Sequence, residues 1–126
     1  MAHEPAWSTV TGAIRLQQAA AALEQTAGGH LRRHRLKLSQ FLLLAALADA
    51  QDATARSTDI AARLGLTTGG VTRLVARSEQ RSYVFRKPNP DDKRSVLVSM
   101  TAYGRQRLDE ATPGFVDLVA GLVVLP

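Results

Sequence analysis

The sequence predicts a mainly α-helical fold with one small β-hairpin. Several segments before residue 82 repeat apolar side chains at helical spacing, and glycines or polar stretches separate them. Residues 83–100 instead alternate apolar and polar side chains around a centre rich in proline and aspartate, as two strands and a turn do. The 126 residues, of which 45% are hydrophobic, are enough to bury one core.

Two longer helices are expected in the first part of the chain, joined by a basic link. Residues 8–27 carry an imperfect apolar stripe, and the pair Gly28-Gly29 is expected to end this helix. Residues 38–50 are apolar on most sides, so this segment is expected to be the central core helix. The link between them, residues 30–37, holds four cations: Arg32, Arg33, Arg35 and Lys37.

A pair of short helices follows a polar loop at residues 51–56. Ser57 is a good N-cap for the first of them, and Gly65 is expected to end it. Thr67 can cap the second helix. The inward face of that second helix is expected to hold Val71, Leu74 and Val75. Two short helices joined by a glycine-containing turn form a helix-turn-helix.

A hairpin and a last helix are expected after residue 82. Strands at residues 83–87 and 95–100 flank a loop at residues 88–93 whose prolines and aspartates disfavour both helix and sheet. A helix-turn-helix with such a hairpin is a winged helix-turn-helix. Thr101 can cap the last helix, which the pair Pro113-Gly114 is expected to bend or break.

The positive charge of the chain is concentrated in its middle. The net charge of the whole chain is +5, but residues 56–107 hold 11 basic and 4 acidic side chains, a net charge of 11 − 4 = +7. A single charge run is usually a solvated face, whereas this excess within a winged helix-turn-helix is typical of a polyanion-binding surface. Double-stranded DNA is therefore the expected partner.

The second helix of a helix-turn-helix enters the major groove with its N-terminal turns at the base edges. Arginine can pair with guanine through two hydrogen bonds, and threonine can contact a base or a thymine methyl group. On the wing, an exposed arginine suits a narrow minor groove, and Asp92 can hold the Arg94 side chain in place. The residues expected to contact DNA are Thr67, Thr68, Gly69, Thr72, Arg73, Arg77, Lys93 and Arg94.

Several motifs in order resemble one family of transcription factors. They are DIAARLGL at residues 59–66, VTRLV at 71–75, PDDKR at 90–94 and VLVSMT at 96–101, followed by Gly104. A weaker match is LSQFLLLAAL at residues 38–47. In this order and spacing the stretch 58–110 resembles the multiple-antibiotic-resistance regulator (MarR) family of winged-helix proteins.

The resemblance implies a homodimer that represses transcription at a palindromic operator. It implies that Arg94 reaches the minor groove with Asp92 as its holder. It also implies release by a small aromatic or hydrophobic effector bound between the dimer arms and the DNA-binding lobe. The chain departs from the family at Gly69-Gly70, Ser78 and Ser82, where Ser or Thr, an apolar residue and Gly are usual. The recognition helix is therefore expected to be weak at both ends.

Both ends of the chain are expected to form a dimer interface. The parts are then an N-terminal dimerisation helix with its link (residues 1–37), a DNA-binding domain (38–100) and a C-terminal dimerisation helix (101–126), truncated relative to the family. Apolar side chains that this small core cannot cover mark an interface. These are Trp7, Val10, Ile14, Phe115, Leu118, Leu122 and Leu125. The alternative is that each end, including an apolar and helical tail from residue 115, folds back on its own core.

Other functions are weaker interpretations of the same residues. Without cysteine, thiol chemistry, disulfides and cysteine–zinc sites are excluded. Gly65 to Gly70 lacks the lysine and spacing of a phosphate-binding loop, so neither an enzyme nor a cofactor is expected. His30 and His34 are four residues apart but lack nearby carboxylates, so no metal is expected. A winged helix that binds protein remains the alternative, and Trp7 with Phe41 could line a pocket or belong to the core.

No membrane or export signal is expected. The N-terminal residues do not combine a cationic stretch with an apolar one, and the longest apolar runs span eight residues, 41–48 and 118–125. About 20 apolar residues are needed to cross a bilayer. The sequence thus predicts a cytoplasmic protein without a membrane partner.

Overall fold

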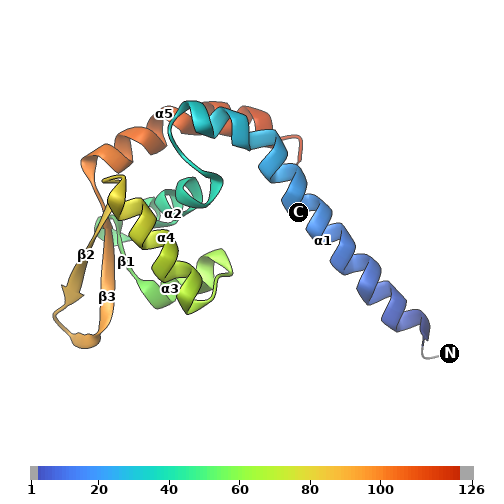
Figure 1. Cartoon of the computed structure of the whole chain (residues 1–126), viewed down its shortest axis with the longest axis horizontal. Coiled ribbons are helices and arrows are strands. Elements are labelled where there is room, and N and C mark those ends of the chain that lie inside the picture. Colours follow the sequence, from blue (N-terminus) through green and yellow to red (C-terminus); the bar gives the residue numbers. More distant parts are fainter. Residues whose placement is uncertain (1–2, 123–126) are drawn as a thin grey trace.

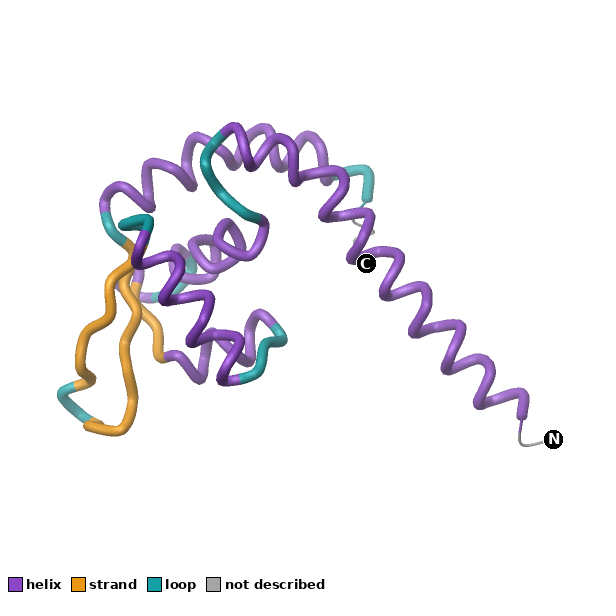
Figure 2. Tube along the Cα trace, viewed as in Figure 1, coloured by secondary structure: helices purple, strands orange, loops and turns teal. Residues whose placement is uncertain are grey.

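The computed structural model describes residues 3–122, with the backbone alone for residues 3–5. Its helices are α1 (His3–Arg33), α2 (Leu38–Ala48), α3 (Ser57–Leu64), α4 (Thr68–Gln80) and α5 (Ala102–Val119). Its strands are β1 (Thr54–Arg56), β2 (Val84–Asn89) and β3 (Asp92–Met100), and a short 3-10 helix (Gln51–Ala53) precedes β1. Helices and one small sheet make up the molecule (Figure 2), as the predicted fold class requires.

Helix α1 is longer than the sequence predicts. It continues through Gly28 and Gly29 to Arg33, so the prediction that these glycines end the helix was wrong. Each glycine costs about 1 kcal/mol relative to alanine in a helix. The fully buried Ala27 and Leu31 anchor this part of α1 in the core, and that packing outweighs the cost. The basic link therefore shrinks to residues 34–37.

The two halves of α1 have different surroundings. The second half lies beside α5 across the top of the molecule, while the first half projects alone as an arm (Figure 1). Side chains 6–20 of this arm are exposed, apart from the half-buried position of Gly12. An isolated helix gains no stability from packing, so the exposed arm depends on a contact outside this chain or on helix propensity alone.

Helix α5 also runs through a predicted break. Pro113 lies inside it, where proline removes one backbone hydrogen bond and typically costs about 3 kcal/mol. Burial of Leu108, Ala111 and Val119 holds the helix together on both sides of the proline. The helix ends at Val119, so residues 120–122 are not part of the predicted helical tail. The rest of that predicted tail, from residue 123 on, lies outside the described residues.

The sheet contains a strand that the sequence did not indicate. Within the predicted loop at residues 51–56, residues 54–56 form β1. This strand pairs antiparallel with β3, and the strand order is β1-β3-β2. Three residues are too few to show an alternating pattern, and the pairing with β3 is what makes them a strand. The hairpin is also longer than predicted, because only residues 90–91 form its turn. Pro88 is tolerated in β2 because this is an edge strand.

The core is built around α2, as predicted. Leu43, Leu44 and Leu47 of this helix are completely buried, and Phe41 is nearly so. Residues from every other helix and from the hairpin pack on this cluster. Within the described residues, no helix combines the length and the apolar content needed to cross a membrane.

Candidate nucleic-acid interface

The turn between α3 and α4 is fixed by backbone geometry and one cap. Gly65 has a φ of 67°, in the left-handed region that ends α3, and the Leu66 amide donates to the Ala61 carbonyl at 3.0 Å. The Thr67 hydroxyl accepts a hydrogen bond from the Gly70 amide at 3.0 Å, which caps α4 as predicted. The first turn of α4 is thus held at a defined angle to α3.

Helix α4 has a buried face and an exposed polar face. Val71, Leu74 and Val75 are buried, as predicted. The predicted DNA contacts Thr68, Gly69, Thr72, Arg73 and Arg77 are all exposed. Neither arginine forms an ion pair among the described residues, so both guanidinium groups keep their hydrogen-bond donors for a ligand.

The two serines that depart from the family pattern both occupy unusual places. Ser78 is completely buried on the inner face of α4, and its hydroxyl has no hydrogen-bond partner. Ser82, just after α4, has a φ of 64°, the left-handed conformation that favours glycine. Both observations agree with the expectation that α4 is weak at its C-terminal end.

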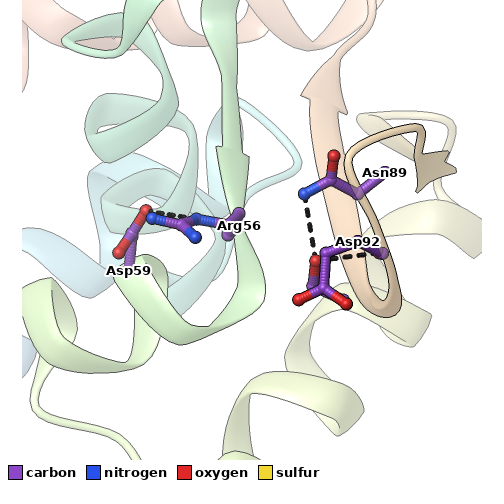
Figure 3. A network of polar contacts seen from close by, with 5 residues as sticks. Arg56, Asp59, Asn89 and Asp92 are labelled. Carbon is purple, nitrogen blue, oxygen red and sulfur yellow. Dashed lines mark hydrogen bonds and ion pairs between the residues drawn. The ribbon is translucent and has the colours of Figure 1, made fainter.

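The tip of the hairpin is held by a small polar network (Figure 3). The Asn89 side chain donates to the Ser95 hydroxyl at 3.0 Å, and that hydroxyl donates to the Asp92 carbonyl at 3.2 Å. The side-chain oxygen Oδ1 of Asn89 also accepts a hydrogen bond from the Asp91 backbone amide at 3.0 Å. Neither Asn89 nor Ser95 was singled out from the sequence, although asparagine before a turn is a known signal.

Asp92 supports the wing through the backbone and not through the Arg94 side chain. Its carboxylate accepts a hydrogen bond from the Arg94 amide at 3.0 Å, and no ion pair joins the two side chains in the described part of the chain. The predicted grip on the arginine side chain is therefore wrong, because a two-residue spacing favours the local side-chain-to-amide turn. Lys93 and Arg94 are exposed at the wing and take part in no ion pair between described residues.

The wing is joined to the recognition helix by an ion pair. The Glu79 carboxylate of α4 lies 2.9 Å from Nη2 of Arg86 on β2 and also accepts from Arg86 Nε at 3.0 Å. A second pair, Arg56 with Asp59 at 3.3 Å, joins β1 to α3 (Figure 3). These contacts fix the hairpin relative to the helix-turn-helix. The hairpin tip and the α3–α4 turn lie at the same end of the molecule (Figure 1).

Arg77 lies one helical turn beyond Arg73, towards the C-terminal end of α4. It is nine residues after Thr68, which at about 1.5 Å per residue is about 13.5 Å along the helix. There it lines a cleft between the end of α4 and the link from α1 to α2. This cleft was not recognised from the sequence, because its residues lie far apart in the chain.

The link beside this cleft is held by Tyr83. This residue is buried, and its hydroxyl donates a short hydrogen bond to the Arg35 carbonyl. Burial raises the pKa of Tyr83, with a further contribution from Tyr103, so the hydroxyl stays protonated as a donor. Arg35 has a φ of 63°, and the Leu36 amide donates back to the Leu31 carbonyl at 2.9 Å. The link therefore has a defined conformation.

The two histidines lie between α1 and α5. His30 Nε2 is 2.8 Å from the Ala111 carbonyl, and the His30 and His34 rings are 4.8 Å apart. Burial, followed by the charges of His30 and Arg107, lowers the pKa of His34 below 6.5. No group of three potential metal ligands occurs in the part of the chain that the structure describes.

The predicted dimer residues divide into two groups. Trp7, Val10 and Ile14 are exposed on the arm, Trp7 to 67%, so Trp7 does not line a pocket with the buried Phe41. Phe115 instead packs on Phe41 of its own core, with ring centroids 4.4 Å apart. The remaining members, Leu118 and Leu122, are exposed at the end of α5, and Leu125 lies outside the described residues.

Comparison with known proteins gives a consistent family. The family model described as MarR family matches residues 35–95. The HTH-type transcriptional repressor YetL of Bacillus subtilis is 27% identical over 88 residues, which are 70% of this chain and 53% of that protein. The chain thus spans about half the length of that relative. That relative is named as a transcriptional repressor and not as an enzyme, in agreement with the expected function of the chain.

Solved structures show the same architecture. Sco3205, a MarR family transcriptional regulator from Streptomyces coelicolor solved in complex with DNA, is 28% identical with a TM-score of 0.78, covering 100% of this chain and 78% of that one. A mutant MarR from E. coli complexed with operator DNA is 23% identical with a TM-score of 0.76, covering 91% of this chain and 79% of that one. The winged-helix fold predicted from the sequence is confirmed.

Proposed function

We propose that the chain is a winged-helix regulator of the MarR family, and that it is a sequence-specific repressor of transcription that binds double-stranded DNA; the family model match at residues 35–95 and the similarity to these regulators support this proposal. The observation that carries the proposal is the set of exposed cations on α4 and the wing that form no ion pair within residues 3–122. Arg73 on α4 and Lys93 with Arg94 on the wing are exposed and have no acidic partner among the described residues. Phosphate neutralisation by such cations is the main sequence-independent source of DNA affinity.

The two elements take different parts of the duplex. Helix α4 enters the major groove with its capped N-terminus, where Thr67, Thr68, Gly69 and Thr72 approach the backbone or bases and Arg73 reads a guanine. The wing lies along the adjacent minor groove with Arg94, and Asp92 shapes the backbone that presents it. Arg77 lies one turn beyond Arg73 and contacts the DNA backbone.

A homodimer completes this function. The arm of α1 exposes Trp7, Val10 and Ile14, and the end of α5 exposes Leu118 and Leu122, so both ends carry uncovered apolar surface. A two-fold dimer that buries these patches would place two copies of α4 about 34 Å apart on a palindromic operator. Phe115 supports this interface from within its own chain, since it packs on Phe41.

An effector is proposed to control release from DNA. The expectation of a small aromatic or hydrophobic effector rests on the family resemblance alone. The alternative function, a winged helix that binds protein, requires the cations of α4 and the wing to serve an acidic partner. The DNA experiment below separates these two functions.

Selection of bound sequences from a random duplex pool tests the proposal. We expect a symmetric motif, and affinity that falls about 1,000-fold or more between 50 and 200 mM salt if a dimer neutralises about 6 to 10 phosphates. Arg73→Ala should relax preference at one position of each half-site, at a cost of about 1–3 kcal/mol. Arg94→Ala should change the preference for A·T-rich flanks. If no sequence motif is enriched, or if the affinity for DNA does not depend on salt concentration, the protein-binding alternative is favoured.

A further inference from the structure

The cleft between α1, α2 and α4 is unusually rich in positive charge. Its volume is about 660 Å³, within the range of small-molecule pockets. The only acidic residue in its lining is Glu24, and Leu36, Leu38 and Gly28 contribute to its apolar surface. The cationic residues of its lining are Arg32, Arg35, Lys37, Arg77 and Arg81.

None of these five cations has an acidic partner among the described residues. Elsewhere in the described chain, five arginines do form ion pairs: Arg56, Arg63, Arg86, Arg105 and Arg107. Unpaired like charges around one hollow repel each other, and a bound anion would offset that repulsion. The charge is thus concentrated where the chain provides no counterion of its own.

The cleft is part of the folded structure and not a chance meeting of side chains. The Tyr83 hydroxyl holds the Arg35 carbonyl, and this fixes the link that carries Arg35 and Lys37. Gly28 is buried in α1, and the absence of a side chain there leaves space for the side chains of Glu24 and Arg32. A Cβ at this position would lie 3.4 Å from Nη1 of Arg32 and 3.5 Å from Oε1 of Glu24. Arg77 and Arg81 project from the last turns of α4, which the core residues Leu74 and Val75 anchor.

DNA is a poor candidate for this cleft. Its α4 residues are the last ones of the helix, whereas base reading uses the first turns, and about 13.5 Å of helix separates Arg77 from Thr68. The α1–α2 link lies on the opposite side of the molecule from the hairpin tip (Figure 1). A singly charged aromatic acid also fits poorly, because it would leave most of the cations without a partner.

We propose that this cleft binds a small molecule with two or more negative charges, of the phosphate-ester, pyrophosphate or polycarboxylate kind. Guanidinium groups match such anions because they form paired hydrogen bonds to phosphate or carboxylate oxygens. The ligand bridges Arg32 at the end of α1 and Arg35 in the link to Arg77 and Arg81 at the end of the recognition helix. It therefore sets the position of α4 relative to α1, and only this regulatory part rests on the proposed function.

Binding can be measured on the full chain without DNA. Pyrophosphate and citrate are titrated into the protein at constant ionic strength while the unfolding temperature is recorded, with salicylate and acetate as singly charged comparisons. We expect saturable stabilisation by the two multiply charged probes and little by the others, since a ligand stabilises the state that binds it. Pyrophosphate that binds more tightly than citrate would indicate a phosphate ligand, and the reverse order a polycarboxylate. Equal stabilisation by salicylate would overturn the proposal.

Paired substitutions locate the site. The variant Arg32→Gln with Arg81→Gln should lose about tenfold or more in affinity for the probe, because each arginine contributes charge-assisted hydrogen bonds. Lys37→Gln with Arg77→Gln is a second pair, in case the first does not fold. The matched control is Arg33→Gln, an exposed and unpaired cation of α1 outside the cleft. Affinity unchanged in both cleft variants would overturn the proposal.

The recognition surface must be excluded as the binding site. Arg73→Gln with Arg94→Gln removes cations from that surface and should leave the affinity for pyrophosphate unchanged. A loss of probe binding in this variant would place the anion on the DNA-binding surface and overturn the proposal. Because the measurement contains no DNA, failure of operator binding would not affect it, and the two proposals can fail separately.

Discussion

Replacing Ser78 by alanine should stabilise the protein. Ser78 is 0% exposed on the inner face of α4, beside Leu74 and Val75, and its hydroxyl has no hydrogen-bond partner. A buried polar group without a partner costs about 1–3 kcal/mol, which Ser78→Ala would recover. Alanine is also the better helix former, by about 0.5 kcal/mol.

One opposing contribution is small. Removing the hydroxyl oxygen leaves a void of about 20 Å³, and at about 24 cal/mol per Å³ that costs about 0.5 kcal/mol. This cost cancels the gain in helix propensity. The expected net gain in the free energy of unfolding for Ser78→Ala is therefore about 1–3 kcal/mol, or about 3–6 °C in melting temperature per kcal/mol for a chain of this size.

Urea unfolding followed by circular dichroism measures this gain, at one fixed protein concentration because a dimer's stability depends on concentration. Ser8→Ala is the matched control: Ser8 is exposed in α1, so its loss should change the free energy of unfolding by no more than about 0.5 kcal/mol. A Ser78→Ala midpoint at or below that of the parent would show that this hydroxyl does not carry a desolvation cost.

Three further predictions concern other positions. Gly104→Ala should destabilise by about 1–3 kcal/mol or more, because a Cβ there would lie 2.2 Å from the Tyr83 carbonyl oxygen, whereas Gly12→Ala, with nothing within 4 Å, should be neutral or stabilising in thermal unfolding. Ser82→Gly should raise the free energy of unfolding by about 0.5–1 kcal/mol, and with it the melting temperature, because glycine adopts a φ of 64° without strain. A lower melting temperature would contradict this. Burial lowers the pKa of His34 in the folded state, so below pH 6.5 the unfolded chain binds more protons than the folded chain does. The free energy of unfolding should therefore fall as the pH drops below that value. In urea titrations at several pH values, His34→Gln should weaken this dependence.

Local signals predicted the winged helix correctly. The Thr67 and Thr101 caps, the left-handed Gly65 and the buried face of α4 all depend on interactions within a few residues, and all lie where the sequence placed them. The left-handed Ser82 was also anticipated, as a departure from glycine. Such features are readable because caps and helical spacing are determined by neighbouring residues.

The candidate site was predicted in part. The sequence pointed to the exposed face of α4 and to the wing, and Arg73, Lys93 and Arg94 are exposed and form no ion pair within the described part of the chain. It did not show that Asp92 would bind an amide, or that Asn89 would close the hairpin. Those contacts depend on the detailed turn geometry.

The sequence alone determined the order of the α-helices and the hairpin, the charge of the central segment and the resemblance to one family, because these follow from composition and short-range pattern. Tertiary structure decided where the long helices end. Gly28, Gly29 and Pro113 are helix breakers by local propensity. The burial of Leu31 on α1 and Leu108 on α5 nevertheless stabilises both helices by more free energy than the unfavourable propensities cost. It also paired β1 with β3 and brought Arg32 and Arg81 to one cleft, because contacts between distant segments leave no periodic trace in a single sequence.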